Sequence, residues 1–241
     1  MKLALIGYGK MGRTIEQVAL QRGHKIVLRI TSANMHEMNT RQLKNADVAI
    51  EFTRPDSARE NVLQCLKAGV NVICGTTGWN EHLAEAEAAA LEHDAAFLFS
   101  SNFSIGVNIF FEINKLLARL MNGRPEYNIS IEEIHHTQKK DAPSGTAITL
   151  AQQIIDNQGN YKNWLLNDPS NPEALPIMAF RTGAVPGTHK ISYTSAIDNI
   201  EIMHTAHNRD GFAHGAVLAA EYVYGKKGIF TMQDVLGTIN K

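Results

Sequence analysis

Short apolar runs alternate with segments of helical periodicity through the first part of the chain. Each run is followed by a segment whose apolar residues recur on one helix face, as Ala58, Val62 and Leu66 do after Pro55. The expected strands are residues 3–6, 25–30, 48–52, 70–74 and 96–99. Because strands that alternate with helices form parallel sheets covered by those helices, this part is predicted to be α/β.

The pattern changes from Gly106 onward. An apolar-rich segment predicts one long helix over 107–121, and the alternation of Tyr127, Ile129 and Ile131 predicts a strand with one buried face. The other elements expected are a helix to about residue 157, an irregular Asn/Pro-rich stretch at 158–176, strands at 177–182, 190–196 and 200–206, and tail helices at 213–224 and 231–236. Without a regular strand and helix alternation, this part is predicted to be α+β.

A glycine motif joins the first expected strand to the first expected helix. It reads Gly7-Tyr8-Gly9-Lys10-Met11-Gly12. In G-x-G-x-x-G, the first glycine permits a tight turn, the second lets the backbone approach a diphosphate, and the third lets the helix pack against the strand. Gly23 ends this helix before the second strand, which completes a βαβ unit. The context predicts dinucleotide binding, and an ordinary glycine-rich turn is the alternative.

Two domains are expected from these patterns. Residues 1–104 and 207–241 are predicted to form a Rossmann-type dinucleotide-binding domain, with the tail helix packing back onto it. Residues 105–206 are predicted to form a second α+β domain that carries a mixed β-sheet, for substrate binding and oligomerisation. A partner subunit is one way to cover the face of that sheet away from its own helices.

The end of the second strand is where a nicotinamide enzyme reads the adenosine ribose. The chain has Thr31-Ser32-Ala33-Asn34 there, without a carboxylate to repel a 2′-phosphate. Arg29 is the only nearby base, and as a strand residue it can point away. This loop predicts use of NADPH, or of both NADPH and NADH.

Two later strand ends also carry ligand-binding residue types. Gly75-Thr76-Thr77-Gly78-Trp79 and Ser100-Ser101-Asn102-Phe103-Ser104 follow the fourth and fifth expected strands. Open α/β sheets bind ligands at the carboxyl ends of their strands, so these loops are predicted to share one crevice with the glycine motif. The alternative is that small and polar residues merely serve turns there.

The most unusual stretch, EEIHHTQKKDAPSGTA at 132–147, lies between a strand and a helix. His135 and His136 are neighbours on an extended segment, so their side chains are expected on opposite faces. Lys139 can share the pocket of His135 if the chain curls after the strand. The backbone N–H groups of Gly145 and Thr146 open a helix, and a helix N-terminus beside a lysine predicts a carboxylate-binding site.

Other interpretations of these polar residues remain. A zinc site is disfavoured because adjacent histidines on opposite faces are poorly placed around one tetrahedral ion, and no H-E-x-x-H spacing occurs. The paired histidines can also be core or solvent-facing residues. His189 and His204 are expected to be structural, and Arg181, which precedes Gly183 and Gly187, is either a further cation beside the site or a hairpin residue.

The amino-acid composition narrows the classes of binding partner. The 23 basic and 24 acidic residues nearly cancel, so no global field favours nucleic acid or a membrane surface. Cys65 and Cys74 fall in an expected helix and an expected buried strand, and two reduced thiols are predicted. The start of the chain runs directly into a strand without a signal peptide, and no apolar run approaches a membrane span, so a cytoplasmic protein is expected.

Motifs along almost the whole chain resemble those of the dihydrodipicolinate reductase family, also named 4-hydroxy-tetrahydrodipicolinate reductase, of bacterial lysine and diaminopimelate biosynthesis. Besides EEIHHTQKKDAPSGTA, they are GYGKMG, EFTRP, GTTGW, NFSIGVN, RTGAVPGTH, RDGFAHGA and MQDVLG, in that order. The resemblance implies hydride delivery from NADPH or NADH to the ring of a cyclic unsaturated dicarboxylate, in a homotetramer.

The resemblance also implies roles for named residues. His135 is expected to be the general acid and Lys139 a second proton donor or charge stabiliser, while His136, Ser144, Gly145 and Thr146 bind the substrate carboxylates. The cofactor residues expected from the motifs and the resemblance together are Gly7, Tyr8, Gly9, Lys10, Met11, Gly12, Thr31, Ser32, Phe52, Gly75, Thr76, Thr77, Ser101, Asn102, Phe103 and Ser104. No metal is expected.

Three features depart from the family pattern. The glycine loop is one residue shorter than the commoner form, Thr137 and Gln138 stand where relatives often have basic residues, and the second strand lacks an acidic–basic pair at its end. Two alternatives to this reductase are kept: a nicotinamide-binding sensor without turnover, and another small-substrate imine or amino-acid dehydrogenase. A sensor has no reason to keep His135, Lys139 and the Ser-Gly-Thr turn together.

Overall fold

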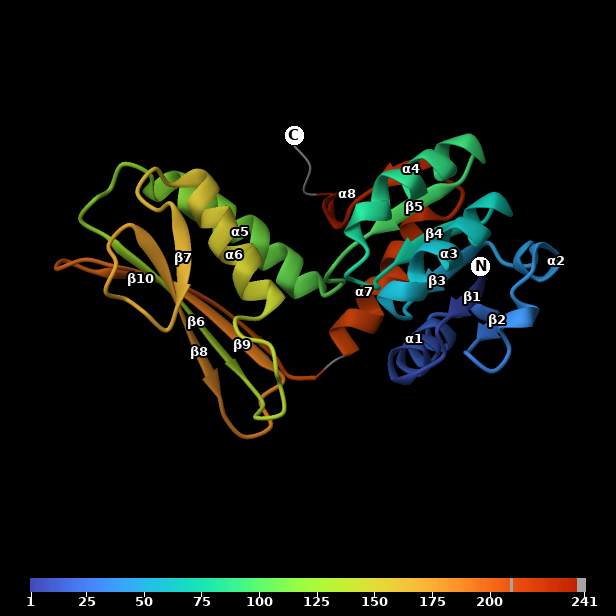
Figure 1. Cartoon of the computed structure of the whole chain (residues 1–241), viewed down its shortest axis with the longest axis horizontal. Helices are drawn as coiled ribbons and strands as arrows, with labels where there is room; N and C mark the ends of the chain where they lie inside the picture. Colours follow the sequence, from blue (N-terminus) through green and yellow to red (C-terminus); the bar gives the residue numbers. More distant parts are fainter. Residues whose placement is uncertain (209, 238–241) are drawn as a thin grey trace. The chain divides into compact units, whose positions relative to one another are not determined.

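The computed structural model describes residues 1–208 and 210–237. Its contacts divide the chain into two compact units: Met1–Ile105 together with Asp210–Lys241, and Gly106–Arg209 (Figure 1). Residues 209 and 238–241, which fall in the tail expected to join the first domain, lie outside the described residues.

A parallel sheet forms the centre of the first unit. In the part of the chain that the structure describes it has six strands in the order β11-β5-β4-β3-β1-β2, and each adjacent pair is parallel. The strands are β1 (Lys2–Ile6), β2 (Lys25–Ile30), β3 (Val48–Glu51), β4 (Asn71–Cys74), β5 (Ala96–Phe99) and β11 (Gly228–Phe230). The five strands predicted from the apolar runs are confirmed to within one residue, whereas β11 is not predicted.

Helices cover both faces of this sheet. On one face Leu5 and Ile50 pack with Ile15 and Val217, and on the other a second apolar cluster contains residues of the remaining two long helices. The helices are α1 (Lys10–Gln21) and α7 (Asp210–Val223) on the first face, and α3 (Pro55–Lys67) and α4 (Leu83–Glu92) on the second, with short turns η1 (Met35–Glu37), α2 (Thr40–Leu43), η2 (Asn80–His82) and α8 (Met232–Leu236). This two-sided α/β arrangement is the Rossmann-type fold expected from the sequence.

The second unit holds a mixed sheet with helices on one face. Its order among the described residues is β10-β9-β6-β8-β7, in which β6, β8 and β7 run parallel and β9 runs antiparallel to both of its neighbours, β6 and β10. Ile131, Ile177 and Ile191 turn toward α5 and α6 and form its core with them. The elements are α5 (Ile105–Met121), β6 (Asn128–His135), α6 (Gly145–Asn157), β7 (Asn163–Leu166), β8 (Ala174–Arg181), β9 (Gly187–Thr194) and β10 (Asn199–Ala206).

The expectation of an irregular stretch at 158–176 is wrong. It contains β7 and the first residues of β8, which pair in parallel from Asn163 opposite Ala174 to Leu166 opposite Ile177. Asn and Pro favour turns, but Pro176 removes only one backbone donor from the ladder. Trp164 and Leu175 join the core, and this burial outweighs the local preference.

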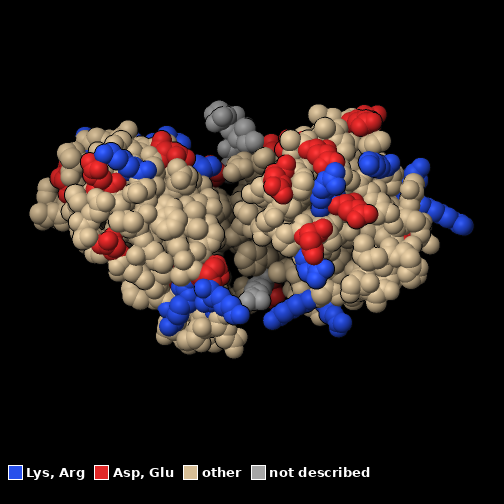
Figure 2. Space-filling view, viewed as in Figure 1, with Lys and Arg blue, Asp and Glu red and all other residues tan. Residues whose placement is uncertain are grey.

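Charge is distributed differently over the two units. Figure 2 shows basic and acidic side chains interspersed on the visible face of the first unit, whereas basic side chains gather at the end of the second unit where β6 and β8 end. None of the described helices is long and apolar enough to cross a bilayer.

Candidate active site

The glycine turn after β1 is built for close backbone packing. Gly7 has φ +98°, and a Cβ there would lie 2.0 Å from the carbonyl oxygen of Phe52. A Cβ on Gly12 would lie 2.3 Å from the carbonyl oxygen of Gly7, whereas one on Gly9 would meet no heavy atom within 4 Å. Gly7 and Gly12 therefore serve the fold of the turn, and Gly9 leaves open space above it, as the motif predicts.

A cavity of about 520 Å³ opens beside this turn. Six residues predicted to bind the cofactor line it: Gly7, Tyr8, Gly9, Thr31, Ser32 and Phe52. The lining residues that the sequence did not indicate include Thr53, Arg54, Ser57 and Asn61 at the end of β3 and the start of α3. Among the described residues the lining contains no Asp or Glu, so no carboxylate opposes phosphate groups there.

The other predicted cofactor residues do not line this cavity. Lys10, Met11 and Gly12 begin α1 behind the turn. The loop after β4 joins it through Thr76, whose Oγ1 accepts a hydrogen bond from the Thr53 N–H at 2.7 Å, and through Gly75, which packs against the Phe52 ring. Phe103 of the loop after β5 packs on Phe52 with 5.6 Å between ring centroids. Thr77 and Ser101 are exposed, and the Ser104 N–H donates to Asn102 Oδ1 at 2.9 Å.

Arg29, the base nearest the ribose-reading loop, is engaged elsewhere. Its guanidinium donates to the Glu16 carboxylate, which also accepts from the Tyr8 hydroxyl. The hydrogen bond from Arg29, which has the larger effect, and the one from Tyr8 hold the pKa of Glu16 below its usual range. Arg29 is not among the residues that line the cavity, so Arg54 is the basic side chain on its wall in the described chain.

The two cysteines are free and buried, as predicted. Burial raises the pKa of both thiols above the ordinary range, and neither is therefore a reactive thiolate. Cys74 donates to the fully buried Glu51 carboxylate at 3.0 Å, which also accepts from the Thr53 hydroxyl. This network fixes the ends of β3 and β4 beside the cavity.

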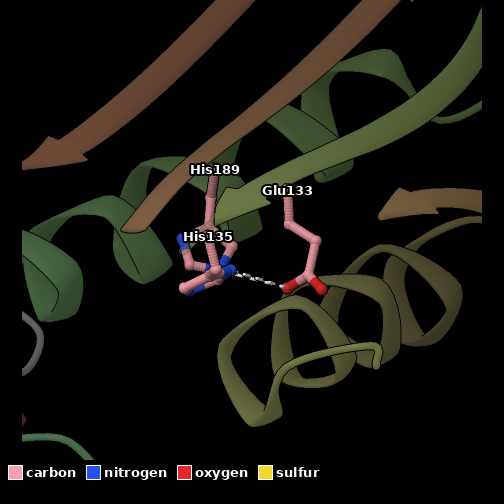
Figure 3. A group of neighbouring side chains, drawn as sticks. All are labelled: Glu133, His135 and His189. Carbon is pink, nitrogen blue, oxygen red and sulfur yellow. Dashed lines mark ion pairs between the residues drawn. The ribbon is translucent and has the colours of Figure 1, made fainter. Parts of the chain in front are cut away.

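A second polar cluster is formed by the strand register of the second unit. Glu133 on β6 lies opposite His189 on β9, and His135, two residues along β6, lies opposite Arg181 on β8. Residues two apart on a strand share a face, so all four project toward the side that α6 covers. Figure 3 shows His135, His189 and Glu133 converging on one point.

Glu133 is the centre of this cluster. Its side chain is 0 % exposed and accepts hydrogen bonds from the Ser144 N–H at 3.0 Å and from Arg181 at 2.8 Å. Ser144 caps α6, with its Oγ accepting from the Ala147 N–H at 3.2 Å and lying 3.0 Å from His189 Nε2. The predicted helix start is thus tied directly to the strand that carries His135.

Burial shapes the proton affinities of the cluster. Desolvation is the largest cause that lowers the pKa of His135, with the Lys139 and Arg181 charges adding to it and Glu133 opposing it. Burial, then the nearby His135, lowers the pKa of His189 to about 4. For Glu133, burial acts to raise the pKa, but hydrogen bonds from Ser144 and Arg181 together with the charge of His135 outweigh it, so the pKa is lowered.

The predicted catalytic and substrate-binding residues divide into two groups. His135, Ser144 and Gly145 lie in or directly beside the cluster, whereas His136 is only half-buried and directly follows the end of β6. The Lys139 ammonium pairs with Asp141 at 2.6 Å, and its charge acts on both His135 and His189. Thr146 lies in the first turn of α6.

The two histidines expected to be structural, His189 and His204, have different surroundings. His204 packs against Phe110, with ring centroids 6.0 Å apart. His189 lies inside the cluster, with its ring centroid 5.2 Å from that of His135. Glu133 and His189 were missed because the motif does not show their pairing. The available signal was Glu133 on the same strand face as Ile131 and His135, since a carboxylate on a buried face requires partners.

A metal ion is the other chemistry that this cluster suggests. Ligand atoms of Glu133, His135 and His189 lie within 4.8 Å of one another. However, the Arg181 guanidinium occupies Glu133 Oε1, and Lys139 adds a second positive charge nearby. Two fixed cations oppose a third in this space, so the donor set fits two imidazole rings packed beside a carboxylate better than a metal.

The fold and the two sites define a class of protein: a Rossmann-type dinucleotide-binding unit coupled to a second unit with a buried histidine cluster. The family description "Dihydrodipicolinate reductase, N-terminus" matches residues 1–103, and "Dihydrodipicolinate reductase, C-terminus" matches residues 106–236. The chain belongs to the dihydrodipicolinate reductase family.

Similar proteins agree with this assignment. The chain is 50% identical over 242 residues to the 4-hydroxy-tetrahydrodipicolinate reductase of Christiangramia forsetii, covering 100% of both chains, and 38% identical to that of Chromobacterium violaceum, covering 81% of this chain and 75% of the relative. A dipicolinate-bound dihydrodipicolinate reductase from Paenisporosarcina sp. TG-14 has the same fold, with a TM-score of 0.80 at 22% identity over 97% of this chain and 98% of the other. An amine dehydrogenase from Mycobacterium smegmatis has a TM-score of 0.60 at 12% identity, over 96% and 95% of the two chains.

Proposed function

We propose that this chain reduces 4-hydroxy-tetrahydrodipicolinate to tetrahydrodipicolinate with NADPH or NADH, in lysine and diaminopimelate biosynthesis. The observation that carries the proposal is the 50% identity to a 4-hydroxy-tetrahydrodipicolinate reductase over the whole of both chains. The reaction consumes one hydride and one proton and releases the substrate hydroxyl as water. A nicotinamide cofactor supplies the hydride when bound.

The residues of the chain have separate tasks in this proposal. The cavity beside Gly7 and Gly9 holds the cofactor, with the open backbone at Gly9 against its diphosphate. His135 supplies the proton, because an imidazole exchanges protons near neutral pH. Lys139 is a second donor or stabilises developing charge, and the start of α6 from Ser144 to Thr146, with His136, binds the substrate carboxylates. The basic side chains gathered at this end of the unit favour a dianion (Figure 2).

Cofactor absorbance tests the function directly. Purified protein is mixed with NADPH or NADH and the freshly made condensation product of aspartate semialdehyde and pyruvate. We expect substrate-dependent loss of nicotinamide absorbance with at least one cofactor. If the chain were a sensor, it would bind the cofactor without turnover, and oxidation at the background rate with both cofactors would contradict the proposal. A dehydrogenase of another class would instead turn over other imines or amino acids.

We further propose that the enzyme accepts both NADPH and NADH, because Ser32 offers a hydroxyl group in a loop that itself carries neither a carboxylate nor an arginine, with Arg54 as the basic side chain on the cavity wall. Ser32→Asp is expected to weaken NADPH binding at least about tenfold, or about 1.4 kcal/mol, by repelling the 2′-phosphate. Ser32→Arg is expected to strengthen it relative to NADH. Titration calorimetry with each cofactor measures the ratio of dissociation constants, and an equal ratio in both variants would remove Ser32 from cofactor selection.

The oligomeric state and the compartment follow from the same proposal. The sheet face away from α5 and α6 exposes Phe180 and Met203 around the Glu132–Lys190–Glu201 ion pairs. We propose that this face assembles a cytoplasmic homotetramer, as the family resemblance implies. A monomeric mass in light scattering at micromolar concentration would contradict the assembly.

A further inference from the structure

His135 has one buried nitrogen that faces Glu133 and one that faces a glycine. The Nδ1 atom is buried without a hydrogen-bond partner among the described residues, and it lies 3.6 Å from Glu133 Oε2. On the other edge of the ring, a Cβ on Gly187 would lie 3.0 Å from Nε2. The glycine thus keeps Nε2 uncovered by a side chain, while the carboxylate faces Nδ1.

Glu133 connects His135 to the start of α6. The same oxygen that faces His135 accepts from the Ser144 N–H, and His189 Nε2 lies 3.7 Å from it and 3.0 Å from Ser144 Oγ. Arg181 holds the other oxygen at 2.8 Å and also donates to the Asp141 carbonyl. The carboxylate is therefore fixed by contacts from β8, β9 and the α6 turn, and a fixed carboxylate can orient a ring.

We propose that Glu133 is a positioning residue for proton transfer, which keeps a proton on His135 Nδ1 and so leaves Nε2 to exchange a proton with the substrate. Through Ser144 and His189 it also couples this ring to the turn that binds the substrate carboxylates. The proposal rests on the proposed function, in which His135 is the general acid. We expect this 3.6 Å separation to shorten when substrate binds, because catalytic hydrogen bonds commonly tighten in the complex.

Charges of both signs act on His135 among the described residues. Glu133 on β6 and Asp141 in the turn favour the imidazolium, whereas Lys139, Arg181 on β8 and a protonated His189 on β9 disfavour it. Burial is the largest effect and also disfavours it. Removing the Glu133 charge therefore lowers the pKa of His135 further. A group that acts as an acid loses activity as pH rises through its pKa, so the alkaline limb of activity moves to lower pH.

NMR of histidine ring nitrogens tests the proposal without turnover. The full-length protein is labelled with ¹⁵N-histidine, and the His135 signals are assigned by their loss in His135→Asn. We expect neutral His135 to be protonated at Nδ1, and Glu133→Gln to lower its pKa by at least about one unit, a tenfold loss of proton affinity. Glu132→Gln, one residue away on the opposite sheet face and paired with Lys190, is the matched control and leaves both unchanged.

A second variant keeps the test valid if Glu133→Gln does not fold. Glu133→Asp keeps the negative charge but moves it one carbon farther from the His135 ring, so we expect a smaller fall of the His135 pKa. If thermal melting shows that Glu133→Gln does not fold, the Glu133→Asp variant decides the test. In each variant that folds, the alkaline limb of the pH dependence of kcat is expected to shift in the same direction as the His135 pKa measured by NMR.

Three results would overturn the proposal: an Nε2-protonated neutral His135 in the wild type, a His135 pKa that Glu133→Gln or Glu133→Asp does not change, or a stoichiometric metal in the purified protein that Glu133→Gln removes. A protein that lacks reductase activity but shows the Nδ1 proton and the pKa shift would refute the proposed function while leaving the role of Glu133 intact.

Discussion

Replacement of Lys139 by alanine is expected to lower kcat by about 10²–10⁴-fold, the usual contribution of a positioned proton donor, while NADPH binding stays unchanged. The Lys139 ammonium pairs with Asp141 at 2.6 Å and its charge acts on His135 and His189, so it belongs to the histidine cluster electrostatically. The cavity beside the glycine turn is lined by other residues, which is why cofactor affinity is spared.

The measurement is steady-state kinetics beside a fluorescence titration with NADPH. Lys140→Ala is the matched control, because Lys140 is the adjacent exposed lysine. Lys139→Arg keeps the charge but is a far weaker acid, so partial activity in that variant indicates charge stabilisation and no activity indicates proton donation. A near-normal rate in Lys139→Ala would remove the lysine from the mechanism.

Replacement of Gly7 by alanine is expected to destabilise the first unit by about 2–6 kcal/mol. A Cβ there would lie 2.0 Å from the Phe52 carbonyl oxygen, and φ is +98°, so overpacking and backbone strain add, at about 1–3 kcal/mol each. Cofactor binding is expected to fall with the fold of the turn. Gly9→Ala is the informative comparison, because its Cβ meets no heavy atom within 4 Å.

Thermal melting with and without NADPH separates the two glycines. Gly7→Ala is expected to melt well below the wild type, whereas Gly9→Ala melts like the wild type but gains less stability from NADPH, since its methyl group occupies the approach of the diphosphate. A Gly7→Ala variant as stable as the wild type would contradict the packing described for this turn.

Short-range apolar patterns predicted the helices and strands whose own residues carry a clear periodicity. The strands β1 to β5 and the helices between them follow from apolar periodicity within short windows. The edge strands β7 and β11 were not predicted from the sequence. The first pairs with β8 across an Asn/Pro-rich loop, and the second pairs with β5, which lies far away along the chain. Their residues carry little periodicity of their own, and only the partner strand makes them strands.

The sites divide in the same way. The glycine turn and the segment around His135 are contiguous motifs, so the sequence located them. The partners of His135 are set by register: His189 opposite Glu133 and Arg181 opposite His135 depend on how β9 and β8 pair with β6. Arg54 on the cavity wall depends likewise on where β3 ends beside the glycine turn. Such pairings cannot be derived from spacing along one strand.

The most direct test of the reductase is the fate of the hydride. Tetrahydrodipicolinate is made enzymatically with nicotinamide cofactor deuterated at C4 on one face at a time, and the product mass is measured. We predict a product one mass unit heavier with one of the two labelled faces and unlabelled product with the other. Oxidation of the cofactor without deuterium in tetrahydrodipicolinate from either face would contradict this function.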